Sequence, residues 1–199
     1  MGCSMSSIFS KGGEGTPSHT NFELEKFDPL SYTPELSKNH IRSRPVSAVH
    51  IVAHSVLLNG GNHWHIYLQT GEEEFVCLEA SPGAFPGREG FLARIDIVEH
   101  AYALTYRPHK IVSIPAKPGH SVASFLDAIV QADNHRYEFT REGRGCGGWV
   151  RGQFYLFVQV GLLPPGWENT FETAINVAWE NEVSQGPWPV TYGTYLRDR

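Results

Sequence analysis

Cysteine is scarce in this chain, which contains only Cys3, Cys77 and Cys146 among its 199 residues. An odd number of widely spaced thiols provides no disulfide framework and is typical of proteins from a reducing compartment. We therefore expect free thiols and a cytoplasmic protein.

Long apolar runs and clusters of basic residues are also missing. No stretch reaches the roughly 18–20 apolar residues of a membrane-spanning helix, and the first residues lack the apolar core of a signal peptide. The formal net charge is −5 and the 16 Lys and Arg residues are dispersed, so we expect no nucleic-acid partner. The hydrophobic content of 41% favours a folded globular protein over a disordered one.

Composition divides the chain into four parts. Residues 1–20 are rich in Ser and Gly and are expected to form a flexible arm. Residues 21–45 contain scattered apolar residues broken by prolines, which predicts an extended lead-in. Residues 46–163 carry the regular hydrophobic patterns of one α+β domain, and residues 164–199 predict a C-terminal helix followed by an aromatic tail that packs on the domain.

The first six residues, Met-Gly-Cys-Ser-Met-Ser, satisfy the pattern for N-terminal acylation. Gly2 would carry a myristoyl chain and Cys3 a palmitoyl chain, and two chains together anchor a protein stably to a membrane. A chance match in a Ser/Gly-rich segment is the alternative. The sequence therefore leaves membrane-surface contact open.

Alternating apolar residues mark seven candidate strand segments and predict an antiparallel sheet of about five or six strands. Three strands form a meander over 46–58, 63–69 and 75–80, a Pro/Gly-rich loop follows at 81–90, and shorter strands are expected at 91–98, 103–106, 111–114 and 137–139.

Helical spacing of apolar residues predicts two or three helices that pack on this sheet. One covers 121–131 with Ser121 as its N-cap, one begins at Cys146, and one covers 171–183. The fold class is therefore α+β.

Cys146 lies in the stretch Arg-Gly-Cys-Gly-Gly-Trp-Val, at the predicted start of an amphipathic helix. Free N–H groups and the helix dipole stabilise a thiolate at such a position and lower its pKa from about 8.5. Gly147 and Gly148 are poor helix formers and would let a ligand approach the backbone. A structural cysteine in a glycine-rich turn is the alternative.

A nucleophilic thiol needs a base and a group that orients the base. His63 follows a glycine turn at the start of a predicted strand, and His65 points to the same side two residues later. Asn62 and Glu79 are the candidate orienting residues on the same and the next strand.

These motifs resemble those of a known family. Asn62–Leu68 and Phe75–Pro82 resemble the His-Trp-x-x-Tyr strand and the following strand of the lecithin:retinol acyltransferase family with its small phospholipase/acyltransferase members. Gly145–Val150 resembles that family's Asn-Cys-Glu-His-Phe-Val motif. The order, with the His strand first and the Cys helix last, is similar to circularly permuted papain-like folds of the NlpC type. The Asn-His-Trp and Gly-Cys-x-x-Trp pair also resembles an uncharacterised fungal family of small proteins.

The resemblance implies that Cys146 is the nucleophile and His63 the general base, with an oxyanion bound by the N–H groups of Cys146 and a neighbouring glycine. Two departures weaken the match. The family's second histidine falls on Cys77, so Glu79 replaces it or the third member is absent. The polar neighbours of the family's nucleophile are glycines here, which leaves an inactive site open.

The sequence thus predicts a cofactor-free, cysteine-dependent hydrolase or acyltransferase for an ester, thioester or amide, with a small-molecule or acyl substrate. Residues expected to contact the substrate flank the two motifs: Trp64, His65, Tyr67, Gly147, Gly148 and Trp149.

Two other classes remain open. One is a cofactor-free protein that acts on or binds a small molecule without covalent chemistry. It would be a cyclase or isomerase of a secondary metabolite with His63 as acid or base, or a binding protein with an aromatic pocket and no catalytic role for His63. The other is a metal-binding protein that uses His63 and His65 with Glu72 or Glu79.

Overall fold

The computed structural model describes residues 28–58, 60–100 and 108–197. The arm at 1–20, with the acylation hypothesis on Gly2 and Cys3, and the strand expected at 103–106 lie outside these residues.

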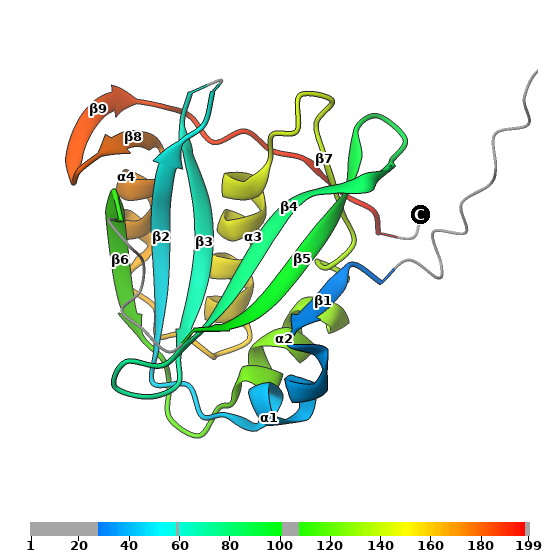
Figure 1. Ribbon diagram of the computed structural model, residues 1–199. Coiled ribbons are helices and arrows are strands. Elements are labelled where there is room, and N and C mark those ends of the chain that lie inside the picture. The colour runs from blue at the N-terminus through cyan, green and yellow to red at the C-terminus, as the bar shows by residue number, and fades with distance from the viewer. Residues whose placement is uncertain (1–27, 59, 101–107, 198–199) are drawn as a thin grey trace, which may run out of the picture.

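An eight-stranded, mostly antiparallel sheet forms the centre of the protein (Figure 1). Seven strands follow one another in the order β10-β7-β5-β4-β3-β2-β6, and β1 pairs with β5 in the only parallel pairing among the described residues. The strands span Leu30–Thr33 (β1), Ala48–Val56 (β2), Asn62–Gln69 (β3), Phe75–Pro86 (β4), Phe91–His100 (β5), Lys110–Pro115 (β6), Tyr137–Phe139 (β7) and Thr194–Tyr195 (β10). The α+β class is confirmed, and the sheet exceeds the expected five or six strands because the short strands β1 and β10 add to β5 and β7.

Four α-helices accompany the sheet in the described chain: α1 (Lys38–Ser43), α2 (Val122–Gln131), α3 (Cys146–Gln159) and α4 (Glu168–Ile175). The predicted helix at 121–131 is confirmed, and a capping box joins Ser121 to Ser124 at its start. None of the helices in the described part of the chain is long and apolar enough to cross a membrane.

Strand alternation decides which side chains meet the helices. Trp64, Ile66 and Leu68 of β3 belong to the large core that includes the buried faces of α2 and α3. His65 and Tyr67 alternate with them and point to the other side of the sheet, where His65 contacts Cys77. There Tyr67 belongs to a second, smaller buried cluster.

The lead-in was predicted as extended over 21–45; Leu30–Thr33 is extended, as strand β1, whereas Glu35–Ser43 is helical and the prediction is wrong there. The chain forms β1, a 3-10 turn at Glu35–Ser37 and then helix α1. Ile41 of α1 is fully buried. Packing of this one apolar side chain, which a periodicity search over so short a segment does not detect, fixes the helix.

Two further boundaries were also wrong. The loop expected at 81–90 is largely strand, because β4 continues to Pro86 and Pro82 pairs with Ala93 of β5. Partner strands here outweigh the local preference of Pro and Gly for loops. The helix expected at 171–183 ends at Ile175 and is followed by a hairpin of β8 (Val177–Glu180) and β9 (Val183–Pro187).

Strands β3 and β4 separate part of the way along the sheet. Their pairing runs from Gln69 opposite Phe75 to Ile66 opposite Leu78 and then stops, while β4 goes on to pair with β5. In Figure 1, helix α3 is seen between the diverging strands. The first residues of β3 are therefore available to the N-terminus of α3.

Candidate active site

Cys146 is the first residue of α3 and is 7% exposed. Gly145 precedes it with φ 144°, a conformation that favours glycine. The Tyr137 hydroxyl donates a hydrogen bond to the Gly145 carbonyl at 3.0 Å and accepts one from the Gly193 N–H at 2.5 Å. Tyr137 thus ties the turn before the thiol to the C-terminal tail.

The thiol lies against the edge of β3 that β4 leaves unpaired. Its Sγ is 4.0 Å from the Asn62 carbonyl oxygen, and the N–H groups of Trp64 and Gly147 point toward the sulfur. No side chain of the described residues caps α3. The first N–H groups of the helix therefore have no partner within the helix and can face an anion.

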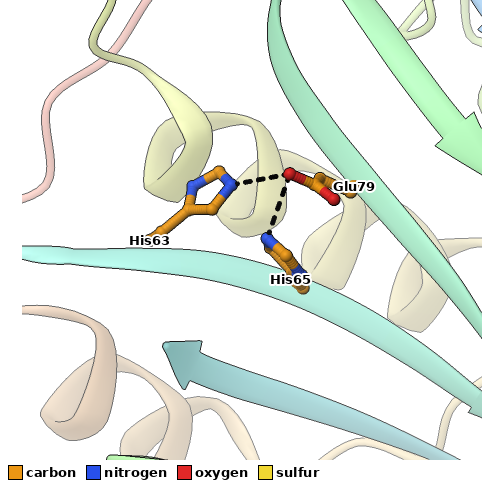
Figure 2. Close-up of side chains that lie close together, drawn as sticks. All are labelled: His63, His65 and Glu79. Carbon is orange, nitrogen blue, oxygen red and sulfur yellow. Dashed lines mark hydrogen bonds and ion pairs between the residues drawn. The ribbon is translucent and has the colours of Figure 1, made fainter. Parts of the chain in front are cut away.

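His63 connects the thiol to a carboxylate. Its Nε2 lies 3.1 Å from Oε1 of Glu79 (Figure 2), and the imidazole also hydrogen-bonds to Cys146. Because Glu79 occupies Nε2, Nδ1 is the nitrogen left for the thiol. The structure thus brings together Cys146, His63 and Glu79, three of the residues expected from the sequence.

Electrostatics favour the charged forms of all three groups. Burial opposes ionisation of the Cys146 thiol, but the hydrogen bond and charge of His63 together with backbone N–H groups lower its pKa from the ordinary value. Burial likewise disfavours a charged His63, yet its hydrogen bonds to Cys146 and Glu79 raise its pKa to about 9. The bond to His63 also lowers the pKa of Glu79. The lowered pKa of Cys146 and the raised pKa of His63 favour a thiolate and an imidazolium side by side, with the Glu79 carboxylate next to the imidazolium in a row of three groups.

A second set of rings lies beside this row. His65 is 7% exposed, and its Nε2 lies 3.6 Å from Glu79 Oε1 while its Nδ1 lies 3.7 Å from the Cys77 sulfur. The ring centroids of His65 and His54 are 4.2 Å apart. Burial and then the charge of His63 lower the pKa of His65 to about 3 and of His54 to about 4, so both rings are neutral. Burial raises the pKa of Cys77 to about 12.

The Asn62 side chain is directed away from His63. Its Nδ2 donates hydrogen bonds to the carbonyl oxygens of His54 and Trp179, both at 2.8 Å, and its Oδ1 accepts one from the Trp179 N–H at 2.7 Å. This buried amide fastens β8 to the β2–β3 hairpin. It was expected as a candidate orienting residue, and the structure places Glu79 in that position instead.

Replacing Asn62 with alanine should lower the free energy of unfolding by about 2–4 kcal/mol, because three hydrogen bonds are lost and backbone groups of Trp179 lose their partner. Urea unfolding measures this, and Asn169→Ala on the exposed side of α4 is the control. The opposite result would be an Asn62→Ala protein that has the urea midpoint of the wild type but reacts more slowly with an alkylating reagent at Cys146. Asn62 would then be the residue that orients His63.

Only some of the residues expected to bind substrate lie beside the thiol. Trp64 and Gly147 line a cavity beside the thiol. Tyr67 is buried on the other side of the sheet, with its hydroxyl 3.2 Å from His54 Nε2. Trp149 is fully buried and donates its indole N–H to the Asn134 carbonyl, which makes it a core residue. Gly148 packs against the tail.

The cavity beside Cys146 holds about 40 Å³ and opens between the β2–β3 turn and the tail. Trp188 lies over Gly60 and Gly61, whose φ values of 82° and 74° and lack of a side chain make room for the indole. The Arg144 guanidinium lies 5.6 Å from the centre of a Trp188 ring. The tail was expected to pack on the domain, but the positions of Trp188 and Tyr137 at the site were not predicted from the sequence.

Two adjacent glycines of α3 provide a matched test of the tail. A Cβ on Gly148 would lie 2.8 Å from the Thr191 carbonyl oxygen and 2.9 Å from Tyr192 Cα, so Gly148→Ala should lower the free energy of unfolding by about 1–3 kcal/mol. A Cβ on Gly147 would meet Trp64 at an ordinary 3.5 Å, and Gly147→Ala should be neutral or stabilise the helix by up to about 1 kcal/mol. Thermal unfolding of both variants checks this, and equal shifts would contradict it.

Comparison with known proteins gives one match. A family model described as a domain of unknown function (DUF7770) covers residues 49–196. Searches of curated proteins and of solved structures find nothing similar.

Proposed function

Because the chain belongs to the DUF7770 family, whose function is unknown, its activity has to be argued from the site, and we propose that it is a cysteine-dependent hydrolase or acyltransferase. The observation that carries the proposal is the row of Cys146, His63 and Glu79 at the N-terminus of α3. Such a row meets the requirements of nucleophilic catalysis, since it contains a nucleophile, a base in contact with it and a group that orients the base.

The geometry supports a two-step acyl transfer. The Cys146 thiolate attacks the carbonyl carbon of an ester, thioester or amide, and a C–S bond forms while the carbonyl oxygen becomes an oxyanion. The N–H groups of Cys146 and a neighbouring glycine stabilise this oxyanion. The tetrahedral intermediate then collapses, and His63 gives its proton to the leaving group.

The second step returns the site to its starting state. Water or an acceptor alcohol or amine attacks the thioester and loses a proton to His63, and the thiolate leaves. Water as acceptor makes the protein a hydrolase, and an alcohol or amine makes it an acyltransferase. Glu79 keeps the imidazole oriented through both steps and stabilises the imidazolium each time His63 carries the second proton.

The order of the elements also supports a circularly permuted papain-like arrangement, as the resemblance to the lecithin:retinol acyltransferase family implies. The strand with His63 comes first, the next strand carries Glu79, and the helix with Cys146 comes last. Glu79 stands two residues after the position of that family's second histidine, on the same strand face.

The cavity favours a short acyl group. The cavity beside the thiol has a volume of about 40 Å³ and is lined by Trp188 and Trp64 among others, so it accommodates only a few atoms of substrate. We therefore propose a small acyl donor, with the remainder of the molecule outside the cavity.

Acylation of the protein by an activated ester tests the proposal. On mixing with p-nitrophenyl acetate, the wild type should release a burst of about one p-nitrophenol per molecule and gain one acetyl group on Cys146 in peptide mass spectra. Cys146→Ser should lose both signals, and Cys77→Ala should keep them. Absence of the adduct, or acetylation of Cys77 to the same extent, would contradict a nucleophilic role for Cys146 and favour the non-covalent cyclase, isomerase or binding-protein hypothesis.

A further inference from the structure

Three potential metal ligands converge beside the nucleophile. Nε2 of His63, Nε2 of His65 and Oε1 of Glu79 come from the neighbouring strands β3 and β4 and point toward one another (Figure 2). Ligand atoms of these three residues all lie within 4.8 Å of one another. Two imidazoles and one carboxylate are a ligand set that binds divalent transition metals such as Zn²⁺.

His65 provides a second, independent observation. Its side chain is 9% exposed, and its Nε2 is buried without a hydrogen-bond partner among the described residues, although it points at Glu79. Buried polar atoms are almost always paired, because an unpaired one loses the hydrogen bonds that water would otherwise make with it. An unpaired nitrogen aimed at a carboxylate oxygen and another imidazole nitrogen is explained by a ligand that binds between the three atoms.

The distances fit a tetrahedral ion. Ligand atoms about 2.0–2.1 Å from Zn²⁺ in tetrahedral geometry lie roughly 3.3 Å from one another. The Glu79 oxygen is 3.1 Å from the His63 nitrogen and 3.6 Å from the His65 nitrogen, on either side of this value. The three ligand atoms lie within 4.8 Å of one another, so a single ion could draw the two imidazoles together around it.

We propose that His63, His65 and Glu79 form a binding site for a divalent transition-metal ion such as Zn²⁺, and that the bound ion switches off the Cys146–His63 pair. The inhibitory part rests on the proposed function. Binding at Nε2 of His63 displaces the proton shared with Glu79, which passes to solvent. The one remaining imidazole proton then sits on Nδ1, facing Cys146. Both ring nitrogens are then occupied, one by the ion and one by a proton, and removal of that proton would require an imidazolate. His63 can therefore no longer accept a proton from the acceptor in the second step.

Calorimetric titration of Zn²⁺ into tag-free protein tests the site without using activity. The wild type should bind one ion, and Cys146→Ser should bind it too, because the thiol is not a ligand. His65→Ala and Glu79→Gln should each weaken binding by about 10-fold or more. His40→Ala, which removes an exposed histidine outside the cluster, is the control and should bind as the wild type does. Glu79→Gln keeps the size of a half-buried residue, so the test does not depend on the folding of His65→Ala.

Three results would overturn the metal site. The first is the absence of zinc binding by the wild type, and the second is zinc binding by Glu79→Gln, or by a folded His65→Ala, that matches the wild type. The third is loss of binding in Cys146→Ser, which would mark a simple thiolate adduct. Inhibition is tested by the p-nitrophenol released after the burst, which Zn²⁺ should suppress in the wild type and spare in His65→Ala. An acetylated Cys146 without zinc binding refutes the metal site alone. Zinc binding without acetylation refutes the proposed enzyme and the inhibitory role, and leaves a metal-binding protein.

Discussion

Replacing His63 with alanine should slow the alkylation of Cys146 by iodoacetamide about 30-fold at pH 7, because only the thiolate reacts and a thiol with an ordinary pKa of about 8.5 is only a few per cent ionised there. In the wild type the charge and hydrogen bond of His63 offset the cost of ionising a buried sulfur. Without the imidazole, burial is the largest remaining influence on the pKa of Cys146, and it disfavours the thiolate. Peptide mass spectrometry over a series of labelling times measures the rate at each cysteine.

Two controls make this result specific. Cys77 should stay almost unlabelled in both proteins, since burial raises its pKa to about 12. Glu79→Gln keeps the hydrogen-bonding shape but removes the charge that holds the proton on His63, so it should slow the labelling of Cys146 less than His63→Ala does. A Cys146 that labels at the same rate whatever residue stands at position 63 would refute the ion pair and with it the proposed enzyme.

The imidazole of His63 should remain protonated up to a pH of about 9, some two and a half units above an ordinary histidine. A raised pKa means that the charged form persists as pH rises and is lost only near pH 9. Activity that depends on the thiolate–imidazolium pair should therefore begin at the lowered pKa of Cys146 and decline above about pH 9. NMR titration of histidine-labelled protein reports the midpoint for each ring.

Two other histidines serve as internal references in the same NMR titration. His65 and His54, whose pKa values are lowered to about 3 and about 4, should still be neutral at pH 5. In Cys146→Ser the thiolate is gone, and the midpoint of His63 should move down because one of the two groups that favour its charge is missing. If His63 titrates near 6.5 in both proteins, no thiolate faces it.

The cysteine, the histidine and the strand of Glu79 could be predicted from the sequence because each rests on local rules. Helical spacing after Cys146 marks the start of a helix, a glycine turn marks the strand of His63, and alternation puts Glu79 on a known face of the next strand. The structure brings these three residues together.

The surroundings of the site could not be predicted, because they depend on contacts between distant parts of the chain. Asn62 bonds to Trp179, which is 117 residues away, and this contact turns the expected end of a helix into strand β8. Tyr137 joins Gly145 to Gly193, and Trp188 lies over the β2–β3 turn. No local pattern of apolar residues encodes such pairs, and the glycines that permit them resemble ordinary loop glycines.

The position of the tail has a consequence for the integrity of the site. The segment from Trp188 to Gly193 is distant from Cys146 in the sequence, yet it lines the cavity, lies against Gly148 and, through Tyr137, holds the turn before Cys146. Detachment of this segment would therefore widen the cavity and release the turn before the thiol, while the strand that carries His63 would keep its pairing with β2.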